Sequence, residues 1–132
     1  MARHTYFPDR GDFVHLNFSP SSQHELADRH YALVLSTSSF AKLTGFAVVC
    51  PITSNTKPWP FDVRIPLGIL PPKAGKHIES VLMTDQVKSI DFRDRGCAFV
   101  AKAPEEILDD ALAKVRAILD SEDVVDEIST SS

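Results

Sequence analysis

Residues 11–103 consist of short apolar or alternating segments, each bounded by proline, glycine or polar residues. Alternation at every second position is typical of a half-buried strand, and a continuous apolar run between turn residues indicates a strand buried on both faces. The strongest run starts at Phe46 and ends at the polar residues 53–56. Because proline cannot donate to a strand ladder, Pro51 indicates that this strand lies at a sheet edge or ends close to Pro51. The patterns predict six strands, at 12–18, 31–36, 46–52, 61–65, 78–83 and 97–101.

A single helix is predicted after the last strand, over residues 104–120. Pro104 suits the first helical position, and Glu105 and Glu106 favour a helix N-terminus. Apolar residues then recur at helical spacing: Ile107, Leu108, Ala111, Leu112, Val115, Ile118 and Leu119. We expect this helix to cover the core or to bind a partner.

The segments between the predicted strands lack a period of their own. Residues 19–28 and 66–77 are long loops, residues 37–45 form a turn or helical bend that closes on Gly45, and residues 84–96 are polar and turn-like. Six short strands and one terminal helix predict a mainly β fold, a small and strongly curved antiparallel sheet or partly open barrel. At 132 residues the chain is one domain, with a flexible arm at 1–10, the barrel at 11–103 and an acidic tail at 121–132.

Composition excludes several classes of protein. Hydrophobic residues make up 43% and charged residues 24%, as in ordinary globular proteins, and no run approaches the ~18 apolar residues of a membrane helix. With no signal peptide either, we expect a cytoplasmic protein without membrane contact. The net charge of −4 resides in residues 104–132, which hold nine carboxylates against two basic residues, so the body of the chain is slightly basic.

Cysteine and histidine spacing gives no sign of a metal or a cofactor. Cys50 and Cys97 each lie in an apolar run, which favours buried free thiols over a disulfide or a metal site. The five histidines are scattered without ligand spacing, and no phosphate-binding glycine motif is present.

Five short blocks in a fixed order resemble the MazF/PemK (Kid-like) toxin family, from about Pro8 to about Leu119. They are Gly11-Asp12, the segment 29–36, Pro51-Ile52-Thr53, the segment 81–90 with Thr84-Asp85-Gln86-Val87, and Arg93-Asp94-Arg95-Gly96. The resemblance implies an SH3-like antiparallel barrel of the CcdB/MazF type with a C-terminal helix, assembled as a homodimer.

The resemblance also implies a function. Members of the family are metal-independent, cofactor-free endoribonucleases that cut single-stranded RNA, mRNA included, at a short sequence and so inhibit translation. The 2′-hydroxyl attacks its own phosphate, which leaves a 2′,3′-cyclic phosphate and a 5′-hydroxyl. The implied inhibitor is a MazE-type antitoxin, and operator DNA bound together with the antitoxin is a further candidate partner.

The resemblance makes four residues candidates for catalysis: Arg29, His30, Thr53 and Asp85. The Thr53 hydroxyl would donate to the phosphoryl oxygens, and Asp85 would take part in proton transfer. The family's Arg-Pro-Ala is His30-Tyr31-Ala32 here, which leaves two alternatives. Either Arg29 clamps the phosphate while His30 moves a proton, or the pair only anchors the loop and activity is weakened.

Six more residues are candidates for RNA binding: His24, Ser54, Asn55, Lys57, Trp59 and Gln86. Trp59 would stack on an unpaired base. Gln86 would contact either a base edge or the dimer partner, and His24 is either an RNA contact or a mobile surface residue. Met83 stands where Kid-like members carry a second arginine, so that contact has no counterpart.

Two other functions remain open at this point. One is a CcdB-like inhibitor of gyrase on the same barrel, whose apolar C-terminal helix would be the working surface. The other is a degenerate member that binds the antitoxin or DNA without nuclease activity.

Overall fold

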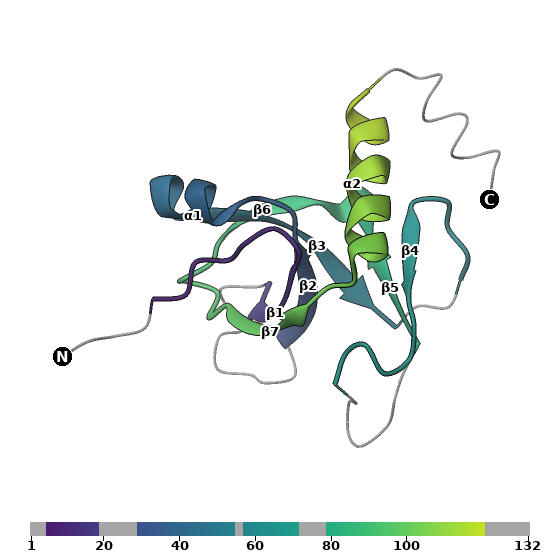
Figure 1. The fold of residues 1–132 in the computed structure, drawn as a ribbon, viewed down its shortest axis with the longest axis horizontal. Coiled ribbons are helices and arrows are strands. Elements are labelled where there is room, and N and C mark those ends of the chain that lie inside the picture. Colours follow the sequence, from purple (N-terminus) through teal and green to yellow (C-terminus); the bar gives the residue numbers. More distant parts are fainter. Residues whose placement is uncertain (1–4, 19–28, 55–56, 72–78, 121–132) are drawn as a thin grey trace.

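The computed structural model describes residues 5–18, 29–54, 57–71 and 79–120. Its elements are, in chain order, β1 (Asp12–Asn17), β2 (Arg29–Val34), α1 (Ser38–Thr44), β3 (Phe46–Thr53), β4 (Asp62–Ile65), β5 (Ser80–Met83), a short 3₁₀ helix η3 (Thr84–Gln86), β6 (Lys88–Asp91), β7 (Ala98–Lys102) and α2 (Glu105–Leu119). Figure 1 shows a curled sheet with α2 standing beside β4 and β5 and with α1 at the opposite end. The predicted fold, a curved antiparallel sheet with a C-terminal helix, is confirmed.

All strand pairs are antiparallel, in the order β4-β5-β3-β2-β1-β7, with β6 also paired to β3. On one edge β3 pairs first with β6, up to Val49, and then with β5, from Ile52 onward. Pro51 lies at this change of partner, two residues before β3 ends. The expectation that the strand ends near Pro51 is confirmed, although β3 is central in the sheet.

The two faces of the sheet are packed by separate sets of side chains, as alternation requires. One face carries Phe13, Leu33, Cys50, Ile52 and Leu82, and α2 closes over it with its buried residues. The other face carries Val14, Leu16, Ala32 and Val49, packed near α1 and β6. Which face a site residue occupies therefore follows from its register.

Helix α1 ends as the sequence predicts. Thr37 caps its start by accepting a hydrogen bond from the Phe40 amide, and Gly45 ends it with φ of 78°. Glycine adopts this left-handed conformation at little cost.

The segment 84–96, predicted to be turn-like, contains a strand, so that prediction was wrong. In β6 only Ile90 is buried, and three polar residues surround it, so the strand has almost no apolar signal. Its pairing with the first half of β3 defines it instead. Long-range pairing of this kind leaves little trace in the local sequence.

The described part of the N-terminal arm, residues 5–10, packs against the domain, in contrast to the predicted loose arm. The Tyr6 hydroxyl donates to Asp12 Oδ2 at 2.6 Å, and Lys102 Nζ lies 2.5 Å from Asp12 Oδ1. Asp12 is only 3% exposed, so this cation and this hydroxyl compensate a buried charge. Pro8 is fully buried.

Candidate functional site

The start of β2 and the end of β3 meet at one end of the sheet. The register pairs Leu33 with Cys50 and Ala32 with Pro51, and continuing it by two residues sets His30 opposite Thr53. On the other side of β3, Thr53 pairs with Val81, and Val81 pairs with Arg64. Residues directly opposite one another share a face of the sheet. His30, Thr53, Val81 and Arg64 therefore form a row on one face, across β2, β3, β5 and β4.

Arg29 lies on the opposite face, because neighbouring residues of a strand alternate. Its Nη2 donates to the carbonyl oxygens of His15, at 3.0 Å, and Gly96, at 2.8 Å, and its Nε donates to His15 Nδ1 at 3.4 Å. A Cβ atom on Gly96 would lie 3.1 Å from Arg29 Nη1, and Gly96 has φ of 62°. The guanidinium thus ties β2 to β1 and to the turn before β7.

The exposed His30 ring stands beside an aromatic and cationic pair. Its centroid is 6.0 Å from that of Phe18, and Lys88 Nζ lies 5.1 Å from the Phe18 centroid. Arg95 donates a hydrogen bond to the Phe18 carbonyl, which fixes this end of β1. The His30 imidazole and the Lys88 ammonium group therefore both lie against the Phe18 ring, although the backbone of Lys88 pairs with Val49, four residues before Thr53.

Asp85 is not part of this row. Strand β5 ends at Met83, and Asp85 lies in the following 3₁₀ helix η3, where its charge adds to the effect of burial in raising the pKa of Cys50 and of Asp62. Its carboxylate accepts a hydrogen bond from the indole Nε1 of Trp59 at 2.9 Å. Within one chain the structure thus brings His30 and Thr53 onto a shared face, with Arg29 behind them, and gives Asp85 a different neighbour.

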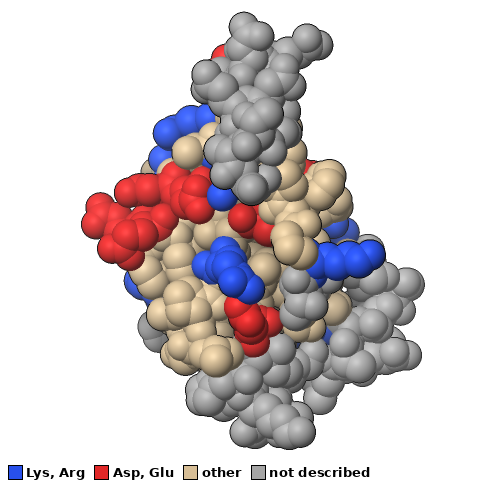
Figure 2. Space-filling view, turned by 90° about the vertical axis from the view of Figure 1, so that its right-hand side faces the viewer, with Lys and Arg blue, Asp and Glu red and all other residues tan. Residues whose placement is uncertain are grey.

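A pocket of about 410 Å³ opens beside the row, and it is lined by Lys57, Pro58, Trp59, Pro60, Asp62, Arg64 and Val81. Asp62 and Arg64 alternate with the buried Val63 and Ile65, so they point away from the core. Figure 2 shows the side of the molecule on the right of Figure 1, where separate Lys/Arg and Asp/Glu patches interrupt a neutral surface.

Of the other RNA-binding candidates, two line this pocket, two lie elsewhere on the surface and two fall outside the described residues. Ser54, Lys57, Trp59 and Gln86 are exposed. Lys57 and Trp59 line the pocket, Ser54 follows Thr53, and Gln86 ends η3. His24 and Asn55 lie outside the residues that the structure describes.

Both cysteines are free thiols, Cys50 buried and Cys97 partly buried. Burial raises the pKa of each thiol to about 12, so both are protonated at neutral pH. Among the described residues no three His, Cys, Asp or Glu side chains converge on one point as metal ligands would. Nor is any helix in the described ranges long and apolar enough to cross a membrane.

Comparison with known proteins places this geometry in a family. A model of the PemK-like, MazF-like toxin of type II toxin–antitoxin systems matches residues 9–119. The chain belongs to this toxin family. It is 35% identical over 103 residues to the endoribonuclease toxin MazF of Escherichia coli strain K12, which covers 77% of the chain and 86% of that protein. It is 30% identical over 114 residues to the endoribonuclease toxin ChpB of the same strain, covering 85% and 94%.

Solved MazF structures share the fold. The crystal structure of MazF (Form-I) from Deinococcus radiodurans matches with a TM-score of 0.72 and 36% identity, covering 87% of this chain and 98% of that one. A MazE–MazF complex (Form-II) from the same organism matches with a TM-score of 0.72 and 32% identity, covering 87% and 97%. The resemblance to the MazF/PemK toxins is thus confirmed.

Sequence analysis of this MazF-like toxin missed two side chains near the site. Asp62 lies on the wet face of the predicted strand 61–65, and that alternation was a signal that could have singled it out. His15, the partner of Arg29, also lies at a polar position of an alternating strand. No local pattern relates it to Arg29, because the two residues meet only through the pairing of β1 with β2.

Proposed function

We propose that this chain is the toxin of a type II toxin–antitoxin system, a metal-independent endoribonuclease that cleaves single-stranded RNA in the cytoplasm and so inhibits translation. Membership of the MazF-like family supports the activity, and curated relatives bear the name endoribonuclease. One geometric observation carries the assignment of residues. His30 and Thr53 share a face at neighbouring strand ends, where His30 is exposed and Thr53 is partly exposed.

His30 takes the proton of the 2′-hydroxyl in this proposal. The activated oxygen bonds to phosphorus, the bond to the 5′-oxygen breaks, and the leaving oxygen takes a proton from water. Histidine suits this task because it exchanges protons near neutral pH. The Thr53 hydroxyl donates to a phosphoryl oxygen as charge builds there. Lys88, whose ammonium group lies over the Phe18 ring that neighbours His30, attracts the phosphate backbone.

Arg29 and Asp85 act through other groups rather than on the phosphate. Arg29 holds the start of β2 against β1 and Gly96, which fixes the backbone that carries His30. Asp85 fixes the Trp59 ring. Of the two alternatives for Arg29, we therefore favour the anchor, with His30 retained as the reacting group.

Similarity to solved structures also supports an antitoxin as a partner. A MazE–MazF complex is among the similar solved structures. We propose a MazE-type antitoxin as the inhibitor of this chain, with an acidic segment that would compete with RNA for the cations around His30. The homodimer and the binding of operator DNA together with the antitoxin are proposed on family grounds alone.

The activity is tested with the purified protein, single-stranded RNA and EDTA. We expect cleavage that leaves 5′-hydroxyl ends, which a kinase labels without prior phosphatase treatment, and no cleavage where the scissile nucleotide is 2′-deoxy. His30→Ala should lower kcat by about 10²–10⁴-fold, the usual contribution of a positioned acid or base.

Thr53→Val removes the hydroxyl at constant shape and should lower kcat by about 10²-fold or more. Thr5→Val makes the same change at an exposed position outside the site and should leave kcat unchanged. RNA that survives in EDTA with the native protein would refute the proposed function. Cleavage that persists at full rate in His30→Ala would refute the assigned base.

A further inference from the structure

The Trp59 ring is fixed so that it offers a face to solvent. The side chain is 53% exposed, its Nε1 donates to Asp85 at 2.9 Å, and the ring stands 6.1 Å from the Phe61 ring at a tilt of 56°. Because its one polar atom already has a partner, further binding uses the π-face. Unpaired nucleobases stack on such platforms.

Asp62 contributes a carboxylate to the same pocket. Its backbone groups are engaged, since its N–H donates to the Trp59 carbonyl and its carbonyl accepts from Lys114 Nζ. No described residue donates a hydrogen bond to the carboxylate itself. Burial raises the pKa of Asp62, the charge of Asp85 raises it further, and Lys114 opposes the shift. A partly desolvated carboxylate gains from any ligand that supplies N–H donors.

Two adjacent N–H donors fit a carboxylate better than one, and guanine is the RNA base that presents them. Its N1–H and N2–H groups lie side by side on the Watson–Crick edge. Adenine and cytosine place an acceptor nitrogen beside their amino group, which would face Asp62 unfavourably. Uracil has one N–H between two carbonyl groups. Watson–Crick edges are free for this contact only in unpaired RNA.

We propose that this pocket is a guanine subsite of the RNA site: the base stacks on Trp59 and its N1–H and N2–H groups donate to Asp62. This assignment rests on the proposed endoribonuclease function. The subsite adjoins the reacting groups, because Val81 lines the pocket and pairs with Thr53, about one strand spacing or roughly 5 Å away, and Arg64 lies one spacing further. That separation suits a base flanking the scissile linkage.

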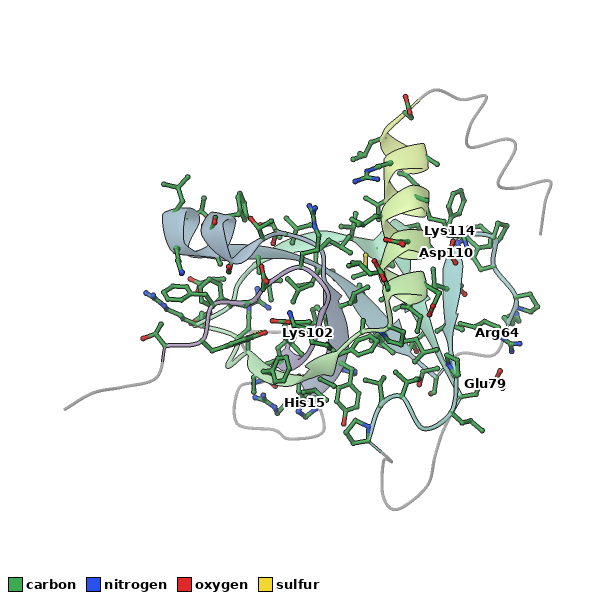
Figure 3. The ribbon with its side chains drawn as sticks, viewed as in Figure 1. His15, Arg64, Glu79, Lys102, Asp110 and Lys114 are labelled. Atoms are coloured by element: carbon green, nitrogen blue, oxygen red, sulfur yellow. The ribbon has the colours of Figure 1, made fainter. Side chains whose placement is uncertain are left out.

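Charges around the pocket agree with a base rather than an acidic peptide as the occupant. Figure 3 shows Arg64 and Glu79 on the right of β4 and β5, with Lys114 and Asp110 beside α2. Arg64 Nη2 is 2.6 Å from Glu79 Oε1, so part of its charge is already paired. The carboxylates of Asp62 and Glu79 would repel an acidic segment, while a neutral base edge meets both donors and acceptors.

Trp59 is the only tryptophan of the chain, so intrinsic fluorescence reports on this pocket directly. The test titrates the native protein with four 2′-deoxy hexanucleotides that are identical except for one central base. The 2′-deoxy sugars remove the nucleophile, and binding is measured without cleavage. We expect the guanine oligonucleotide to quench at a concentration about tenfold lower than the other three, or lower still, as bidentate readout of a base gives.

Asp62→Asn should abolish that preference, since the amide replaces one acceptor by a donor. Asp109→Asn removes the same charge from an exposed position on α2 and should retain the preference. Equal quenching by all four oligonucleotides would overturn the guanine assignment, and no quenching by any of them would overturn the subsite.

Cleavage of ordinary RNA, measured in parallel, separates this inference from the proposed function. RNA cleavage without guanine-dependent quenching would leave the nuclease standing and remove the subsite. Guanine-dependent quenching without cleavage would leave the subsite standing and remove the nuclease.

Discussion

Replacing Arg29 distinguishes an anchor from a phosphate clamp. Arg29→Ala removes two hydrogen bonds from Nη2, to the carbonyl oxygens of His15 and Gly96, and a longer one from Nε. Bonds from a charged donor contribute about 1.5–3 kcal/mol each when buried, and we discount that range because the Gly96 contact is exposed. We therefore expect a loss of about 2 kcal/mol in the free energy of unfolding, which lowers Tm by about 6–10 °C in a domain of this size.

Differential scanning calorimetry and cleavage kinetics, both on the same preparations, give the answer. At a temperature well below Tm, Arg29→Ala should reduce kcat far less than His30→Ala does. Gly96→Ala should lower Tm without removing a charge, because its Cβ would press on Arg29 Nη1 and the backbone has positive φ. Arg116→Ala, at an exposed position of α2, is the charge control. An unchanged Tm in Arg29→Ala together with complete loss of cleavage would refute the anchor.

Three further predictions concern stability and reactivity. Thr84→Val should cost about 1–2 kcal/mol in urea unfolding, because the fully buried Thr84 hydroxyl donates to the Phe61 carbonyl at 2.5 Å; an unchanged midpoint would contradict this. The Ser38 amide donates a hydrogen bond to the Asp9 carboxylate and lowers the pKa of Asp9. The stabilisation from this contact is present above the unfolded pKa of about 3.9 and is lost as pH falls through the lower folded pKa. Asp9→Asn should therefore make the free energy of unfolding less dependent on pH in the acid range, and an unaltered pH profile would count against the contact. Cys50, with its pKa raised to about 12, should react with iodoacetamide at about pH 8 only as fast as the chain opens, so rapid labelling of the native protein would show that the thiol is not buried.

Local patterns determined all the described strands except β6, and they also determined the terminal helix and the family of this protein. The strands β1 and β4 correspond to the alternating segments 12–18 and 61–65, and β3 corresponds to the apolar run from Phe46. In each strand the buried positions are mostly the apolar ones, so the local pattern already marks the strand. The stripe after Pro104 became α2 for the same reason. Five short blocks in a fixed order were enough to indicate the toxin family, because sequence blocks can be recognised without knowing which residues touch in the fold.

Tertiary pairing decided the rest. The sequence placed Arg29 and His30 side by side, just before the strand predicted at 31–36. Only the structure, in which β2 begins at Arg29, put them on opposite faces and showed that His30 shares the face of Thr53. Likewise Asp85 met Trp59 only when β5 and η3 packed against the loop before β4. These contacts join residues that are far apart in the chain. The free energy that fixes them comes from burying both faces of one sheet at once, and a short segment of sequence does not show which distant segment it will be buried against.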